Sequence, residues 1–102
     1  MPNNNSLPPI HPGEILLEEF MKPNEINAHQ LSLSLRVPAN RIGQIIEGER
    51  AITADTALRL GRYFGIDPEF WLRLQATYEI RAAKREFEAQ IEREVQPREE
   101  AA

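Results

Sequence analysis

Proline, glycine and capping residues divide this chain into short helical stretches, and they constrain its fold more than any other feature. Pro12 suits the first turn of a helix, and Pro23 ends that helix. Asn27 is a favourable N-cap, and Gln30 follows at the spacing of a capping box. Because short helices are not stable alone, several of them must pack together.

Similar signals mark two helices further along the chain. Pro38 is expected to open a third helix, and Gly48 closes it where a left-handed residue is favoured. Thr53 caps a fourth helix, which ends at Gly65.

A fifth helix begins with Asp67 as its N-cap and Pro68 in its first turn, and it can run to about Val95. No stretch alternates between apolar and polar residues, so no strand is expected. The sequence therefore predicts an all-α fold of five helices in which the C-terminal helix is extended.

The helical pattern divides the chain into three parts. Residues 1–10, which are rich in asparagine and proline, are expected to form a flexible arm. Residues 11–80 hold the five-helix domain, and residues 81–102 hold the extension of the last helix and a tail. The expected core consists of Ile15, Leu16, Leu17, Phe20, Met21, Leu31, Leu35, Ile42, Ile45, Ile46, Ala57, Leu58, Leu60, Phe64, Phe70, Trp71, Leu74 and Tyr78.

Composition excludes several classes of protein. A chain of 102 residues, 41% of them hydrophobic, fits one domain with a modest core. The chain has no cysteine, so disulfide and thiolate chemistry are excluded. No apolar run approaches the ~20 residues that span a bilayer, and the N-terminus does not resemble a signal peptide. We expect a cytoplasmic protein that does not bind membranes.

The net charge of −4 is unevenly distributed. Residues 36–65 carry five arginines against three acidic residues, whereas the flanking residues 1–35 and 66–102 are acidic. Nucleic acid can therefore bind at the centre of the chain, although the field of the whole protein steers DNA only weakly.

The second and third helices are separated by only a few residues around "RVP". This arrangement is typical of a helix-turn-helix, in which one helix braces the next and the next enters the major groove of DNA. In the third helix the isoleucines are expected to face the core, and the outward side chains are Ala39, Asn40, Arg41 and Gln44. Small residues such as Ala39 and Gly43 permit a close approach to DNA.

A second interpretation stays open from the pattern alone. Polar residues opposite an apolar stripe normally form a solvated face, and Gly43 is then a tolerated weak point in a small helical bundle. The pattern by itself favours neither DNA binding nor the plain bundle.

Four motifs in a fixed order resemble the HigA family of bacterial antitoxins, within the Xre/Cro-like helix-turn-helix class. They are "HPGEIL" before the first helix, "RVPANRI" across the turn and third helix, "ITADTALRLGRYFG" in the fourth helix and "PEFWLRLQ" in the fifth. Together they cover residues 11 to about 80. This ordered set is far more specific than a bare helix-turn-helix pattern.

Two positions depart from the family pattern. Alanine usually stands in the bracing helix where this chain has Ser32, and glycine usually stands in the turn where it has Arg36. An arginine in a left-handed conformation costs free energy that glycine does not. Either the turn differs in this chain, or the strain at Arg36 is accepted.

The resemblance implies a double role. Such an antitoxin binds an mRNA-cleaving toxin similar to HigB and silences it by forming a complex. It also binds the operator DNA of its own operon as a homodimer and represses transcription, and the toxin can modulate that repression. Two alternatives remain, a stand-alone Xre-family transcriptional regulator without a toxin and a helical adaptor that only holds proteins.

The resemblance also implies the DNA-binding residues. The set expected to meet bases or nearby phosphates is Ala39, Asn40, Arg41 and Gln44, because Asn and Gln can pair with adenine and Arg with guanine. The set expected to touch the flanking backbone is Asn27, Arg50 and Thr53. For Asn27 and Thr53, helix capping alone is the plainer explanation.

No group of residues indicates catalysis or a metal site. His11 and His29 lie far apart in a chain without cysteine, and His11 is more typical of a helix cap. Adjacent glutamates such as Glu18 and Glu19 point apart on a helix, so they do not form an acid–base pair. We expect no enzyme, no metal and no cofactor.

An apolar stripe continues along the fifth helix beyond the length that a compact five-helix domain can cover. Its members are Ile80, Ala83, Phe87, Ile91 and Val95. A stripe without a partner in its own chain suggests a helix of another chain. Ile80, Phe87, Ile91 and Val95 are therefore predicted to form a dimer or toxin interface, with a frayed tail of accidental periodicity as the alternative.

Overall fold

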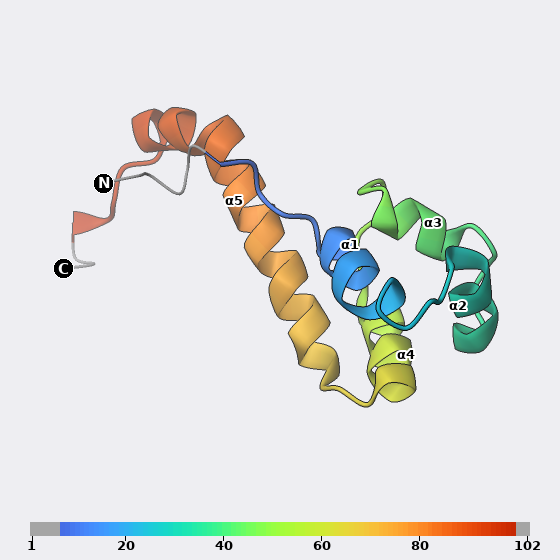
Figure 1. Cartoon of the computed structure of the whole chain (residues 1–102). Coiled ribbons are helices and arrows are strands. Elements are labelled where there is room, and N and C mark those ends of the chain that lie inside the picture. The colour runs from blue at the N-terminus through green and yellow to red at the C-terminus, as the bar shows by residue number, and fades with distance from the viewer. Residues whose placement is uncertain (1–6, 100–102) are drawn as a thin grey trace.

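The computed structural model of this chain describes residues 7–99. The elements are α1 (Pro12–Ile15), η2 (Leu16–Met21), α2 (Ala28–Leu35), α3 (Arg41–Ile46), α4 (Ala54–Phe64) and α5 (Pro68–Glu94). Because η2 continues α1 directly, residues 7–99 hold five helical segments, and they contain no strand (Figure 1). The predicted all-α helix-turn-helix fold with an extended last helix is confirmed.

The first helix begins as the sequence indicates, and its start explains the "HPG" tripeptide. Nδ1 of His11 accepts a hydrogen bond of 2.9 Å from the backbone amide of Gly13, and Pro12 occupies the first turn. A Cβ at Gly13 would collide with the carbonyl oxygen of Ile45 in α3. Glycine is therefore required here because the backbones of α1 and α3 touch.

The second half of this helix is wider than the α-helix that the sequence predicts. Leu16–Met21 forms a π-helix, in which the amide of Lys22 bonds to the carbonyl oxygen of Leu17 over 2.9 Å. The wider turn places Leu16 and Met21, five residues apart, together on the buried side.

The core gathers side chains from every helix. Its buried hydrophobic members are Leu16, Met21, Leu31, Leu35, Ile42, Ile45, Ile52, Ala57, Leu60 and Trp71. The ring of Phe20 lies 4.9 Å from that of Trp71 and 5.2 Å from that of Phe64, between centroids. These ring contacts pack the first helix against α4 and against the start of α5. The sequence predicts core residues at that start.

One predicted core residue is wrong. Leu58 is 62% exposed, whereas the other expected core side chains are buried or half-buried. The buried side of α4 follows Ala57, Leu60 and Gly61 at helical spacing, and Leu58 lies beyond its edge.

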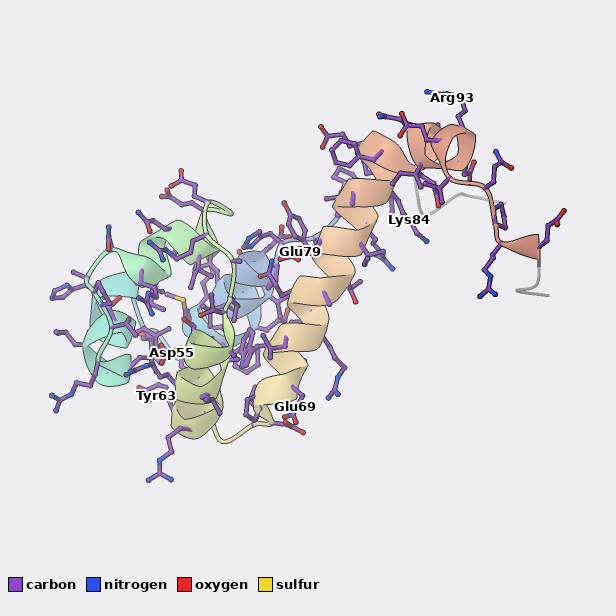
Figure 2. The ribbon with its side chains drawn as sticks, turned by 180° about the vertical axis from the view of Figure 1, so that it is seen from behind. Asp55, Tyr63, Glu69, Glu79, Lys84 and Arg93 are labelled. Atoms are coloured by element: carbon purple, nitrogen blue, oxygen red, sulfur yellow. The ribbon has the colours of Figure 1, made fainter. Side chains whose placement is uncertain are left out.

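The long helix α5 lies against the bundle at its start and leaves it toward its end. Oδ1 of Asp67 accepts from the amide of Glu69 over 3.0 Å, which confirms the predicted cap. Oε1 of the buried Gln75 accepts from the amide of Ile52 over 2.8 Å and ties α5 to the segment before α4. Figures 1 and 2 show the last turns of α5, which carry Arg93, bending away from the other helices.

The N-terminal arm lies partly within the described residues. The carbonyl oxygen of Leu7 accepts a hydrogen bond of 2.8 Å from Arg85 of α5, so the end of the arm runs along that helix. The rest of the arm that we expected to be flexible, residues 1–6, lies outside the described residues.

Candidate nucleic-acid interface

The bracing helix α2 is capped as its sequence indicates. Oδ1 of Asn27 accepts from the amide of Gln30 over 2.8 Å, and Oε1 of Gln30 accepts from the amide of Asn27 over 2.9 Å. This reciprocal pair is the predicted capping box. Asn27 is exposed although it caps α2, so a phosphate can still reach this end of the helix.

The turn after α2 keeps its shape although it lacks glycine. Arg36 adopts φ 60° and ψ 47°, the left-handed conformation. The amide of Val37 bonds to the carbonyl oxygen of Ser32 over 3.1 Å, and that of Arg36 to Leu33 over 3.2 Å. These two bonds form a Schellman motif, so the chain accepts the strain of a left-handed arginine at position 36.

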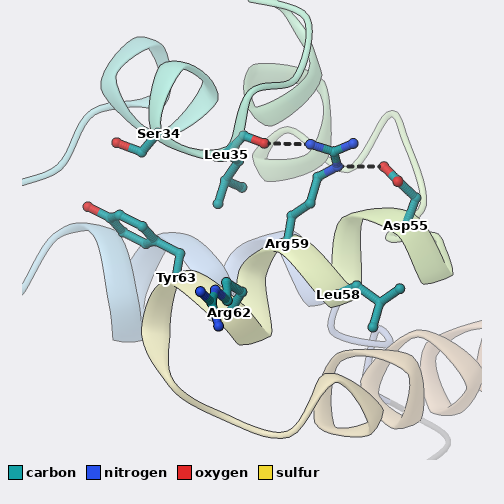
Figure 3. Close-up of a pocket in the computed structure, with 7 residues that line it drawn as sticks. All are labelled: Ser34, Leu35, Asp55, Leu58, Arg59, Arg62 and Tyr63. Carbon is teal, nitrogen blue, oxygen red and sulfur yellow. Dashed lines mark hydrogen bonds and ion pairs between the residues drawn. The ribbon is translucent and has the colours of Figure 1, made fainter.

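Arg59 of α4 secures this strained turn, a contact that the sequence analysis does not predict. Its Nη1 atom lies 2.9 Å from the carbonyl oxygen of Leu35 and 3.3 Å from that of Arg36, and its Nε atom lies 3.0 Å from Oδ2 of Asp55. Figure 3 shows the guanidinium between α2 and α4, beside an open groove of about 430 Å³. A cation at the C-terminal end of α2 satisfies carbonyl groups that have no partner inside the helix.

Helix α3, which we call the recognition helix because the sequence predicts that it enters the major groove, starts later than expected. It begins at Arg41, because Pro38 starts a turn in which the amide of Arg41 bonds to the Pro38 carbonyl oxygen over 3.0 Å. Oγ of the buried Ser32 donates to the carbonyl oxygen of Ala39 over 3.3 Å. An alanine in place of Ser32 would remove this hydrogen bond between α2 and the turn.

A second Schellman motif closes the recognition helix. The amide of Gly48, at φ 78°, bonds to the carbonyl oxygen of Ile45 over 3.0 Å, and that of Glu49 to Gln44 over 2.8 Å. The chain thereby folds back along α3. As a result, Nε of Arg50 lies 2.8 Å from Oε1 of Gln44.

Most of the residues predicted to touch DNA are accessible. The exposed members are Asn27, Ala39, Asn40, Arg50 and Thr53, and Gln44 is half-buried. Thr53 also caps α4, since its Oγ1 atom accepts from the amide of Thr56 over 3.5 Å. Asn27 and Thr53 therefore both cap helices, as expected.

Arg41 lies differently from the other predicted DNA contacts. Its side chain is only 24% exposed, and Nη1 lies 3.5 Å from Oδ2 of Asp55. Its Nε atom is buried and finds no hydrogen-bond partner among the described residues. Asp55 thus holds both Arg41 and Arg59, and it links the start of α3 to α4.

Gly43 is not required by the packing of the chain itself. Apart from its chain neighbours and the backbone of its own helix, a Cβ at Gly43 would have no atom within 4 Å. Any need for glycine at this position has to come from a molecule that approaches α3 from outside.

Within the part of the chain that the structure describes, no helix is long and apolar enough to cross a membrane.

Fold and site together define a helix-turn-helix protein, and residues 17–71 match the family model described as Helix-turn-helix. The chain is 50% identical over 82 residues to virulence-associated protein I of Dichelobacter nodosus, covering 80% of this chain and 76% of that protein. Two solved structures are also similar. An addiction module antidote protein of the HigA family from Coxiella burnetii matches with a TM-score of 0.85 at 50% identity, over 90% of this chain and 100% of that one.

The other structure is the Pseudomonas aeruginosa antitoxin HigA with the higBA promoter. It matches with a TM-score of 0.85 at 43% identity, over 87% of this chain and 97% of that one. The chain belongs to the helix-turn-helix family and, within it, to the HigA family of antitoxins.

Proposed function

We propose that this protein is the antitoxin of a toxin–antitoxin module, which neutralises a HigB-like mRNA-cleaving toxin and represses its own operon as a homodimer. One observation carries the proposal: an accessible recognition-helix face stands on a fold that matches HigA-family structures with a TM-score of 0.85. The relative from Pseudomonas aeruginosa was solved with a promoter, which supports operator DNA as the ligand. Such a protein works in the cytoplasm, where it meets both DNA and the toxin.

The DNA surface consists of α3 and the residues that flank it. Asn40 and Gln44 carry base readout, and Ala39 lets the helix approach closely. The flanking residues Asn27, Arg50 and Thr53 hold the phosphate backbone. Arg41 supports the start of α3 and has less freedom to read bases, because Asp55 holds its guanidinium.

The extension of α5 supplies the surface for a second chain. Ile80, Phe87, Ile91 and Val95 are exposed, although they are large and apolar. In a symmetric dimer two recognition helices meet successive major grooves, so the operator is a palindrome with half-site centres about 34 Å apart or a multiple of that. Replacing Phe87 and Ile91 by serine is expected to lower the mass in light scattering or to weaken toxin binding.

Toxin binding and DNA binding use different surfaces in this proposal. The proposed toxin surfaces are the arm, α1 and α5. Figure 1 shows that residues 7–10 of the arm and α5 lie on the side of α1 that faces away from α3. The double variant Asn40→Ala with Gln44→Ala should therefore still protect cells from the toxin while it loses operator binding. A folded double variant that failed to protect cells would show that the two surfaces overlap.

The proposal is tested by co-expressing the chain with the product of the adjacent reading frame. Co-purification and rescue of growth are expected, together with a gel shift on the DNA upstream of the operon. A gel shift without any toxin partner would make the protein a stand-alone regulator. Toxin binding without a gel shift would make it a protein-binding adaptor.

A further inference from the structure

Two residues of the proposed DNA surface are bonded to each other before any DNA is present. Nε of Arg50 donates to Oε1 of Gln44 over 2.8 Å. Because a guanidinium has only donors, the oxygen of the amide and not its NH₂ group must face it. The hydrogen bond therefore selects one of the two orientations that the Gln44 amide can adopt.

The backbone, and not only the length of the arginine, brings the two side chains together. The amide of Glu49 bonds to the carbonyl oxygen of Gln44 over 2.8 Å, and Gly48 supplies the left-handed residue of that turn. This closure returns the chain to the last turn of α3. Arg50, the next residue, is thereby held beside Gln44.

The hydrogen bond leaves useful groups on both partners. Within the described residues, Nε2 of Gln44 has no hydrogen-bond partner, and Oε1 keeps a second lone pair. Gln44 can therefore still donate to N7 of adenine and accept from its amino group, in the selected orientation only. Arg50 is exposed, and its two terminal NH₂ groups remain available for a phosphate.

We infer that Arg50 is a positioning residue for Gln44. Arg50 orients the base-reading amide of Gln44 in advance and couples it to the neighbouring phosphate that Arg50 itself binds. This inference rests on the proposed DNA-binding function and adds to it. An arginine that only held phosphate would strengthen binding to every sequence alike. An arginine that also orients Gln44 strengthens binding to the operator more than binding to other sequences. Gln44 then loses less side-chain freedom when it binds its base.

Binding titrations on operator and scrambled duplexes separate these two roles. Arg50→Ala is expected to lower operator affinity roughly 3- to 10-fold more than scrambled-duplex affinity. In the Gln44→Ala background the same change should lower both affinities equally. Arg50→Lys is the matched control for charge: it should keep the scrambled-duplex affinity but lose the same roughly 3- to 10-fold of operator preference, since lysine lacks the planar fork.

An equal loss on both duplexes in both backgrounds would overturn the inference and leave Arg50 as a phosphate contact alone. Nuclear magnetic resonance of the free chain tests the same hydrogen bond without DNA. Arg50→Ala should shift the side-chain amide signals of Gln44 and leave those of the exposed Gln90 unchanged. Unchanged Gln44 signals would also overturn the inference. A wild-type chain that shows no operator preference would instead defeat the proposed function, and the resonance experiment would still decide whether Arg50 positions Gln44.

Discussion

Nη1 of Arg59 donates to the carbonyl oxygen of Leu35 over 2.9 Å and so fastens α4 to the end of the bracing helix. Arg59→Met should lower the free energy of unfolding by about 1–3 kcal/mol, because carbonyl groups at the end of α2 lose a charged partner. Urea denaturation followed by circular dichroism measures this change. The control is Arg62→Met on the same helix, where the side chain is exposed. Equal losses for the two variants would show that the contact with α2 adds nothing.

The left-handed residues at the two Schellman motifs predict opposite outcomes. Arg36→Gly should raise the free energy of unfolding by about 1 kcal/mol, because glycine adopts φ 60° without strain. Gly48→Ala should lower the same quantity by about 1 kcal/mol, because alanine is strained at φ 78°. Thermal and chemical denaturation measure both variants. A destabilised Arg36→Gly would mean that the arginine side chain makes a compensating contribution.

At Gly43 we expect one substitution to change stability and DNA binding in opposite directions. Gly43→Ala should raise the free energy of unfolding by roughly 0.5–1 kcal/mol, since alanine favours the helix and its Cβ meets no atom of the chain within 4 Å. If glycine serves the approach to DNA, as we predict, the same variant should bind the operator more weakly. A more stable variant with undiminished operator affinity would reduce Gly43 to a tolerated weak point.

His11 makes stability depend on pH. Burial lowers the pKa of His11 below its ordinary value of 6.5, and the Gly13 amide requires Nδ1 to stay unprotonated. The unfolded chain therefore binds more protons between the two pKa values, so the free energy of unfolding falls as the pH drops below 6.5. Above that pH the contribution is fully present. Denaturation curves from pH 7.5 down to about pH 5 measure the effect.

The control for this prediction is His11→Asn. Asparagine caps a helix but does not titrate, so the variant should lose the part of the pH dependence that His11 causes. The same slope in the variant and the wild type would assign that dependence to other groups.

Capping residues and helix-ending glycines predict the helix ends well, because each of them acts on the backbone next to it. The Asn27 capping box, the Thr53 cap and the Gly65 end all follow from residues within one turn. The predicted start of α3 at Pro38 is too early, since proline suits both a first helical turn and the tight turn that Pro38 makes here.

Long-range contacts could not be predicted in the same way. Arg59 is a plain basic residue in the sequence, and its partners Leu35 and Arg36 are more than twenty residues away. Arg41, whose side chain is only 24% exposed, likewise pairs with Asp55 in another helix. Composition and spacing carry no information on such contacts. They predict that Ala39, Asn40 and Gln44 are accessible around α3, but neither the partial burial of Arg41 nor the hydrogen bond of Gln44.

The contact of Gly13 with the backbone of Ile45 enlarges the set of residues on which the proposed repression depends. Any side chain at position 13 must push α1 and α3 apart, which displaces the recognition helix although Gly13 lies in a different helix. A screen that scores only loss of repression would therefore recover Gly13 beside Asn40 and Gln44. If the chain represses transcription as proposed, the residues that decide whether the gene is silenced outnumber the residues that can touch its DNA.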